Sequence, residues 1–244
     1  MPRMAGTNQD VFNGRCEQIS APETAEIWLD FDGTLSDRDV VDALVRGYCP
    51  TDAWRALETD WQAGRIGSRV CLAGQFGLVR IGEKELDAFL ASVSLDPGAK
   101  ALLSLLSDCG VRATILSDGI DWFIDRILRA HHLRPPRVLS NTLARAGESW
   151  RLICPHASST CSVAAAHCKC ASMERLEAPG RQRIYVGDGG SDLCAARKAH
   201  VRFAKGVLAS RLAEEGFGFY PFATLHDVCR VLEAAWSRSK VLAA

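Results

Sequence analysis

The sequence predicts an α/β protein, in which helices wrap both faces of a doubly wound parallel sheet. Three observations support this fold class. Short apolar runs that end in polar or glycine residues recur along the chain, helical segments separate them, and residues 39–96 contain helical patterns alone. The 244 residues, 48% of them hydrophobic, are enough to bury one sizeable core and a smaller appended unit.

Four apolar segments have the composition of buried parallel strands. They are AEIWLDF (25–31), VRATILSD (111–118), RIYVGDGG (183–190) and HVRFAKG (200–206). Helical segments lie between or after them, at 98–110, 120–133 and 191–200. Because strands and helices alternate, we expect a Rossmann-like sheet with helices on both faces.

Residues 39–96 interrupt this alternation. Four segments there have helical periodicity and none resembles a strand: 39–48, 52–64, 68–79 and 83–93. We therefore expect a small all-helical cap, residues 39–96, inserted after the first strand into a core of residues 25–38 and 97–236. Residues 1–24 are polar and without periodicity, which predicts a loose N-terminal tail.

Composition limits the class of partner. Lys and Arg number 29 and so do Asp and Glu, so no net field favours nucleic acid or an anionic membrane. No apolar run has the length of a membrane span, and the first residues contain no segment typical of a signal peptide. We expect a cytoplasmic protein with a small-molecule partner, and its ten cysteines as reduced thiols. The sequence indicates no oligomeric state.

Two carboxylates, Asp30 and Asp32, end the first predicted strand in the stretch IWLDFDGTLSD. In a doubly wound sheet, ligands bind beyond the carboxyl ends of the strands. Two acids so close repel each other unless a cation or a shared proton offsets their charge. An isolated Asp-Phe-Asp-Gly fits a polar turn equally well, so the other strand ends must decide between the two interpretations.

The ends of the second and third strands also carry polar groups. Ser117 ends the second strand, where its hydroxyl could bind phosphate oxygens, and Gly119 follows in a turn. Asp188 and Asp192 follow the third strand, so four carboxylates are expected to converge on a hard cation such as Mg²⁺. Lys169 lies upstream, where an ammonium would balance a carboxylate and a phosphoryl group, although most lysines are solvated surface residues.

These motifs resemble, in type and order, those of the haloacid dehalogenase-like hydrolases: Asp30-x-Asp32-Gly33-Thr34, Ser117, Lys169 and Gly187-Asp188-Gly-x-Ser-Asp192. The resemblance covers roughly residues 26–230 and is to the phosphoserine-phosphatase-like branch, which has a small cap between its first two motifs. Within that branch, the stretches DFDGTLSDRDVVDAL, SDGIDWFI and PFATLHDV are most similar to two groups of enzymes. These are the methionine-salvage 2-hydroxy-3-keto-5-methylthiopentenyl-1-phosphate phosphatases and the phosphoethanolamine/phosphocholine phosphatases.

The resemblance implies a Mg²⁺-dependent phosphatase that hydrolyses a small phosphomonoester through an aspartyl-phosphate. Asp30 would be the nucleophile and Asp32 the general acid and base, a division that splits one difficult hydrolysis into two displacements. Ser117 and Lys169 would hold the transferring oxygens. The other implied residues are Asp30, Asp32 (through its backbone carbonyl), Asp188 and Asp192 for the metal, and Gly33, Thr34 and Gly119 for the phosphate site.

The cap departs from phosphoserine phosphatase at two positions. Asp39 stands where that enzyme has a glutamate, and Arg69 is the nearest cap cation but lacks the expected offset from Gly64. Both are candidate substrate-binding residues, although Arg69 fits a solvated surface residue equally well. An amino-acid substrate is therefore disfavoured. Two alternatives stay open: a phosphotransferase with an acceptor other than water, and a noncatalytic binding protein on the same scaffold.

Between residues 154 and 170 the chain gathers side chains of the kinds that bind zinc: Cys154, His156, Cys161, His167, Cys168 and Cys170. Their spacing contains no C-x2-C pair, and two of the cysteines flank Lys169. Packing or loop thiols are the favoured interpretation, with structural zinc as the alternative.

Overall fold

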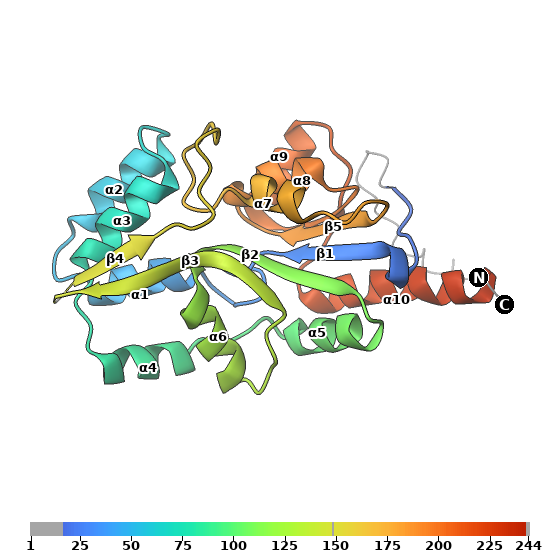
Figure 1. Cartoon of the computed structure of the whole chain (residues 1–244), viewed down its shortest axis with the longest axis horizontal. Coiled ribbons are helices and arrows are strands. Elements are labelled where there is room, and N and C mark those ends of the chain that lie inside the picture. The colour runs from blue at the N-terminus through green and yellow to red at the C-terminus, as the bar shows by residue number, and fades with distance from the viewer. Residues whose placement is uncertain (1–16, 148, 243–244) are drawn as a thin grey trace, which may run out of the picture.

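The computed structural model describes residues 17–147 and 149–242. Seven strands form one sheet in the order β4-β3-β2-β1-β5-β6-β7 (Figure 1). All neighbouring pairs are parallel except β3 and β4, which are antiparallel. The strands are β1 (Ala25–Leu29), β2 (Arg112–Ile120), β3 (Arg137–Ala146), β4 (Ser149–Ile153), β5 (Gln182–Gly187), β6 (Val201–Ala204) and β7 (Tyr220–Pro221).

Helices cover both faces of the sheet (Figure 1), which confirms the doubly wound α/β fold predicted from the sequence. On one face lie α7 (Lys169–Leu176), α8 (Leu193–Lys198) and α9 (Gly206–Glu214). On the other lie α5 (Ala99–Asp108), α6 (Asp121–Ala130) and α10 (Leu225–Leu242). The four predicted strands correspond to β1, β2, β5 and β6.

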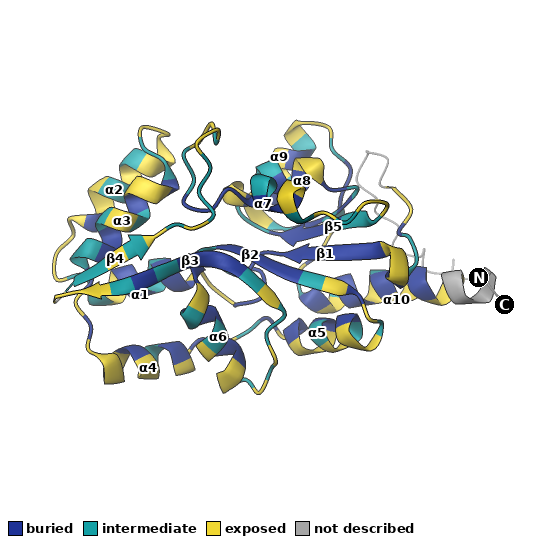
Figure 2. Ribbon diagram, viewed as in Figure 1, coloured by how far each residue is buried: buried dark blue, intermediate teal, exposed yellow. Residues whose placement is uncertain are grey.

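Burial on both faces explains why the central strands are largely apolar. All five residues of β1 are buried (Figure 2), as expected for a strand that lies between two helical layers. The covering helices are apolar on one side only. In α6 the buried residues are Phe123, Ile124, Ile127 and Leu128, which recur with the period of a helix.

The cap consists of four helices, α1 (Val40–Tyr48), α2 (Trp54–Gln62), α3 (Ser68–Leu78) and α4 (Glu83–Ala91). No strand occurs in residues 40–91, all of which the structure describes. A bridge between Ser36 and Leu95 ties the two ends of the insertion together. Buried cap residues, among them Leu44, Phe76 and Leu86, belong to the same hydrophobic cluster as β1 and β2. Within the insertion α2 packs on α3, whereas α4 packs on the core helix α6, on the other side of the sheet (Figure 1).

A hairpin of β3 and β4 extends the sheet beyond the predicted strands. Its antiparallel register runs from Thr142 opposite Ile153 to Ala146 opposite Ser149. The outer strand β4 packs against the cap helix α3, and the ring of Trp150 lies 5.9 Å from that of Trp122. The sequence analysis predicted neither strand. The hairpin brings a second segment of the core against the cap.

The predicted tail divides into two parts. Residues 1–16 lie outside the described residues, whereas residues 17–24 contact the core. Ile19 is buried, the Ser20 amide donates a hydrogen bond to the Gln182 side chain at 2.8 Å, and Trp236 Nε1 donates to the Ser20 carbonyl at 3.1 Å. The described end of the predicted tail is thus attached to β5 and α10.

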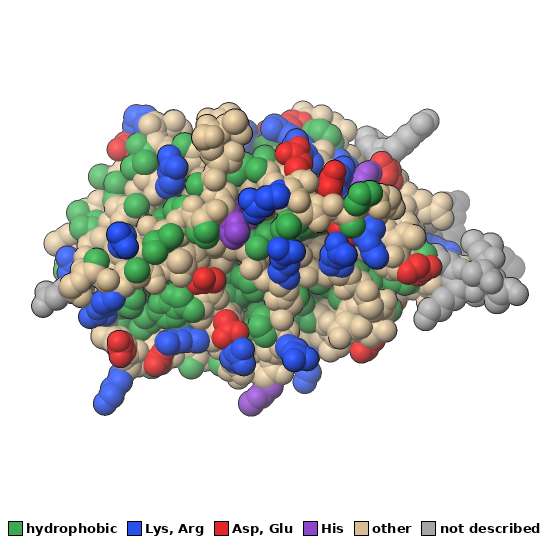
Figure 3. Space-filling view, in the orientation of Figure 1, with side chains coloured by type: hydrophobic (Ala, Val, Ile, Leu, Met, Phe, Trp, Pro, Cys, Tyr) green, Lys and Arg blue, Asp and Glu red, His purple; other side chains and the backbone are tan. Residues whose placement is uncertain are grey.

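Surface charge is mixed on the face shown in Figure 3, where Lys and Arg side chains alternate with Asp and Glu. Within the described residues, no helix combines the length and the apolar character needed to cross a membrane.

Candidate active site

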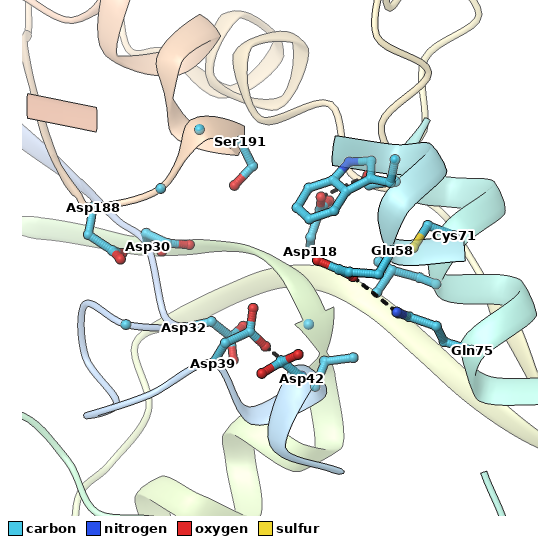
Figure 4. Close-up of a pocket in the computed structure, with 18 of the residues that line it drawn as sticks. Asp30, Asp32, Asp39, Asp42, Glu58, Cys71, Gln75, Asp118, Asp188 and Ser191 are labelled. Carbon is cyan, nitrogen blue, oxygen red and sulfur yellow. Dashed lines mark hydrogen bonds between the residues drawn. The ribbon is translucent and has the colours of Figure 1, made fainter. Parts of the chain in front are cut away.

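The carboxyl ends of the neighbouring strands β2, β1 and β5 meet beneath the cap. A cavity of about 460 Å³ opens there, between the strand ends on one side and helices α1, α2 and α3 on the other (Figure 4). The core side contributes Asp30, Asp32, Asp118, Lys169 and Asp188. Strand order therefore gathers the four aspartates, which are far apart in the sequence, and the first residue of α7 adds Lys169.

A buried ion cluster forms the floor of this cavity. Lys169 Nζ lies 2.6 Å from Asp30 Oδ1 and 2.6 Å from Asp192 Oδ1, and Lys169 is only 2% exposed. Burial disfavours the lysine charge, but the carboxylates of Asp192 and Asp30 outweigh it and raise the pKa of Lys169 well above its ordinary value. Lys169 is therefore a charged residue of the site, and the surface interpretation is wrong.

Asp192 is fully occupied by donors from the protein. Its Oδ1 accepts hydrogen bonds from Lys169 and from the Tyr185 hydroxyl, the latter at 2.7 Å. Its Oδ2 accepts from the amides of Asp188 and Gly189, at 3.0 and 2.9 Å. With four donors in place, Asp192 fixes the loop after β5 and the position of the lysine.

Oxygen atoms of Asp30, Asp188 and Asp192 lie within 4.8 Å of one another, close enough to hold one metal ion. Burial, followed by the charge of Asp192, raises the pKa of Asp30 well above its ordinary value. A divalent cation would relieve that repulsion, and carboxylate oxygens are the ligands that Mg²⁺ prefers. The donor set therefore fits a divalent metal.

Gly33 and Thr34 hold Asp188 in this arrangement. Thr34 Oγ1 donates a hydrogen bond to Asp188 Oδ1 at 2.8 Å. Gly33 has a φ of 78°, and a Cβ at that position would lie 2.5 Å from Asp188 Oδ2. Two features therefore favour glycine at position 33: the positive φ of its backbone and the close approach of the Asp188 carboxylate.

Asp32 lies apart from the ion cluster. Its Oδ1 accepts a hydrogen bond from the Val40 amide at 2.9 Å, and its Oδ2 accepts from Ser117 Oγ at 3.0 Å. The Gly119 amide in turn donates to Ser117 Oγ at 2.8 Å. Burial, followed by the charge of Asp39, raises the pKa of Asp32 to about 7. Asp32 can therefore exchange a proton near neutral pH, as an acid–base catalyst must.

The cap wall of the cavity is acidic and partly aromatic (Figure 4). It contains Asp39, Asp42, Glu58 and Trp61, and its cation Arg46 is paired with Asp42 at 2.6 Å. The side chain of Glu58 is held by other cap residues: Gln75 Nε2 donates to it at 3.2 Å and Gln62 Nε2 at 2.9 Å. Of these residues the sequence analysis identified only Asp39 as a site residue.

The remaining predicted residues fall into two groups. Gly33, Asp39 and Gly119 line the cavity, as do Asp30, Asp32, Lys169 and Asp188. Four do not line it: Ser117 and Thr34, whose hydroxyls bind Asp32 and Asp188, the buried Asp192, and Arg69. Arg69 is exposed, and its backbone amide donates to the Ala164 carbonyl at the edge of the cap. The structure thus brings no cationic cap residue other than Arg46 to the cavity wall within its described part.

In the described residues, the cysteine and histidine cluster does not bring three potential ligand atoms within 4.8 Å of one another. Within residues 17–147 and 149–242, Asp30, Asp188 and Asp192 are the only set of three or more potential ligands close enough to hold an ion. His167 is engaged through both ring nitrogens, with the Ser117 carbonyl at 3.0 Å and Ser172 Oγ at 2.8 Å. These contacts support the interpretation of the cluster as packing and loop residues.

The family model and the relatives that match this chain are all described as phosphatases. Residues 26–204 match the family model described as Putative Phosphatase. The chain is 29% identical to the 2-hydroxy-3-keto-5-methylthiopentenyl-1-phosphate phosphatase of Geobacillus kaustophilus, over 85% of this chain and 94% of the relative. It is 30% identical to the enzyme of the same description from an Exiguobacterium species, over 84% and 95%.

Solved structures show the same fold. A phospho-aspartyl intermediate analogue of phosphoserine phosphatase superposes with a TM-score of 0.65 at 17% identity, covering 86% of this chain and 98% of that one. A probable phosphoserine phosphatase from Vibrio cholerae superposes with a TM-score of 0.67 at 17% identity, covering 93% and 70%. The family match and the shared fold together assign the chain: it belongs to the putative phosphatase family, among the haloacid dehalogenase-like phosphatases.

Proposed function

We propose that the chain is a Mg²⁺-dependent phosphatase that hydrolyses a small phosphomonoester through an aspartyl-phosphate on Asp30. The observation that carries the proposal is the buried cluster in which Lys169 contacts both Asp30 and Asp192 at 2.6 Å, at the floor of the cavity. A cation fixed beside a carboxylate can hold an incoming phosphoryl group close to that carboxylate.

In this proposal the metal is held by Asp30, Asp188 and the backbone carbonyl of Asp32. Asp192 supports it by orienting the loop that carries Asp188, because protein donors already occupy both oxygens of Asp192. When bound, Mg²⁺ would neutralise charge on the phosphoryl oxygens and on the acidic cluster. Asp30 and Asp188 offer the oxygen ligands that suit it.

The protein residues divide the chemistry between two carboxylates. A carboxylate oxygen of Asp30 attacks phosphorus, and the leaving alkoxide takes a proton from Asp32. Asp32 then removes a proton from the water that hydrolyses the aspartyl-phosphate. The pKa of about 7 at Asp32 supports both steps near neutral pH.

Lys169 and Ser117 hold the phosphoryl oxygens in the proposed mechanism. Lys169 remains charged beside Asp30 and supplies a fixed positive group. Ser117 Oγ donates to Asp32 Oδ2, and in this proposal it turns to a phosphoryl oxygen when substrate binds. The Gly119 amide, which donates to Ser117 Oγ, keeps that hydroxyl at the strand end.

The cap wall supports a compact leaving group without a carboxylate. Asp39 and Glu58 would repel a carboxylate across the cavity, and the cavity of about 460 Å³ suits a small molecule. Esters with keto, hydroxyl or cationic amine groups fit these walls, whereas phosphoserine, phosphopeptides and nucleic-acid ends fit them poorly. The 2-hydroxy-3-keto-5-methylthiopentenyl-1-phosphate in the relatives' name is one such keto and hydroxyl ester.

A panel of phosphorylated metabolites, assayed for phosphate release with Mg²⁺ and again with a chelator, tests this proposal. We expect hydrolysis that depends on Mg²⁺, with kcat/KM higher for small keto, hydroxyl or amine esters than for phosphoserine. A phosphopeptide as the best substrate would overturn the closed-cavity part of the proposal. Full activity without metal would overturn the Mg²⁺ part.

A further inference from the structure

Three segments of the chain meet at the carboxylate of Asp118, at the edge of the cavity. Asp118 follows Ser117 in β2, and its Oδ2 accepts a hydrogen bond from Ser68 Oγ at 3.0 Å. Its Oδ1 accepts from the His167 amide at 2.7 Å. Ser68 begins the cap helix α3, and His167 lies two residues before Lys169. One carboxylate therefore contacts the cap and the segment that leads to the lysine.

Ser68 contacts both of the other segments at this junction. Its Oγ donates to Asp118 and accepts a hydrogen bond from the Ala166 amide at 2.9 Å. A Cβ on the preceding Gly67 would lie 2.3 Å from the Ala164 carbonyl oxygen, so the start of α3 lies directly on the backbone of residues 163–166. The start of α3 cannot separate from residues 163–166 and from β2 without breaking both hydrogen bonds of the Ser68 hydroxyl.

The segment that receives these contacts is hydrogen-bonded to the elements that carry Ser117 and Lys169. His167 Nδ1 donates to the Ser117 carbonyl at 3.0 Å, because a carbonyl can only accept, and Nε2 therefore accepts from Ser172 Oγ at 2.8 Å. The ring thus ties the end of β2 to α7, the helix that begins with Lys169. A displacement at residues 164–167 would reach Lys169 through two to five peptide units.

We propose that Asp118 is a positioning residue that couples the cap to Lys169. Its hydrogen bonds to Ser68 and to the His167 amide make closure of α3 over the cavity and placement of the lysine a single event. This inference rests on the proposed phosphatase function, and it adds to that function a link between cap closure and the charged floor. Hydrogen bonds to a carboxylate are strong enough to carry such coupling.

Two variants, Ser68→Ala and Asp118→Asn, test the coupling singly and together. Each should lower kcat for p-nitrophenyl phosphate about tenfold, the loss expected for one hydrogen bond to a charged group. Because both substitutions break the same junction, kcat of the double variant should fall no further than kcat of the less active single variant. Thr59→Ala is the matched control, since it removes an exposed cap hydroxyl that bonds only to the Arg55 carbonyl in α2, and it should leave kcat unchanged.

Hydrogen exchange supplies a readout that does not require turnover. Orthovanadate with Mg²⁺ is the probe, and in the wild type it should slow exchange in residues 67–71 and 164–169 together. In Ser68→Ala it should slow exchange in 164–169 but no longer in 67–71, whereas a merely structural serine would leave the joint response intact.

The outcomes separate the coupling from the proposed function. Losses that multiply in the double variant, or a joint exchange response that survives in Ser68→Ala, would overturn the coupling. A wild-type protein that hydrolyses no phosphomonoester would instead overturn the proposed function, and the exchange response would still report whether the two segments are linked.

Discussion

The two walls of the cavity are built differently. On the core wall, Asp30 is paired with the buried Lys169, which it shares with Asp192, a buried residue that does not itself line the cavity. On the cap wall, Asp39 precedes α1 and Glu58 lies on α2. Both line the cavity, and neither has a cationic partner among the ion pairs of the described residues. Tightly paired groups suit the phosphoryl group, which is common to all substrates, and the acidic cap wall suits discrimination between leaving groups.

The difference predicts that a change in the core wall abolishes chemistry while a change in the cap wall alters substrate preference. The largest effect should follow from Asp30→Asn, which removes the nucleophile but keeps the side-chain volume. We expect kcat to fall about 10⁴-fold or more, measured as phosphate release, with an unchanged circular dichroism spectrum. Wild-type turnover in this variant would remove Asp30 as the nucleophile.

Replacing the shared cation tests the pairing in the core wall. Lys169→Met leaves the carboxylates of Asp30 and Asp192 buried without their partner, so the free energy of unfolding should fall by about 3–5 kcal/mol. Lys198→Met breaks the exposed pair with Glu174 and should cost about 1 kcal/mol or less. Denaturant unfolding of both variants makes the comparison, and equal losses would contradict the distinction between paired and exposed charges.

A glycine of the core wall allows a matched comparison of backbone and contact effects. Gly33→Ala and Gly216→Ala both put alanine at a positive φ, 78° and 75°, but only at Gly33 would the new Cβ lie 2.5 Å from Asp188 Oδ2. Both should lose about 1 kcal/mol of stability from backbone strain. Only Gly33→Ala should also raise the Mg²⁺ concentration needed for half-maximal activity. A normal Mg²⁺ requirement in that variant would show that Asp188 is not held by this approach.

The pH dependence of the reaction connects the two walls. Because the pKa of Asp32 is raised to about 7, the protonated acid needed in the first step is present below that pH and lost above it. We expect kcat/KM to fall as the pH rises through about 7. Asp39→Asn removes a negative neighbour of Asp32, so the pKa of Asp32 should drop and the falling limb should move to lower pH. An unmoved limb would show that Asp39 does not act on Asp32.

The smallest effect should come from the cap wall. Glu58→Gln removes one negative charge that faces the cavity, and it should raise kcat/KM for phosphoserine relative to glycerol phosphate by about two- to fivefold. Glu85→Gln, on the exposed side of α4, is the matched control and should leave this ratio unchanged. If both variants leave the ratio unchanged, the acidic wall does not select the leaving group.

The sequence predicted the core wall well because its residues follow apolar strands directly. Asp30 and Asp188 directly follow β1 and β5, and Ser117 lies in the last part of β2, which continues to Ile120 beyond the predicted strand end. Parallel strand order brings such ends together. It also predicted Lys169, but by resemblance to a known motif, since a lone lysine gives no physical signal of burial. The role of Asp192 as an acceptor for two backbone amides became visible only in the folded loop.

The cap wall could not be predicted in the same way. Which face of α2 presents Glu58 depends on how α2 packs on α3, and nothing local in the sequence fixes that packing. Arg69 has the charge expected of a residue that binds a substrate carboxylate, yet it does not line the cavity. Its neighbour Ser68 is the residue of this turn that faces the core, where it donates to Asp118. The strand β4 could not be predicted for a related reason, since it is a short edge strand with no fully buried residue.

Mapping the phosphoenzyme is the most direct test of the proposed chemistry. The protein would be mixed with Mg²⁺ and its best substrate, quenched in acid within a turnover, digested, and analysed by mass spectrometry. The account predicts one phosphoryl group on the peptide that contains Asp30, absent when Asp30→Asn is treated in the same way. Rapid phosphate release with the phosphoryl group on another residue, or on none, would contradict it.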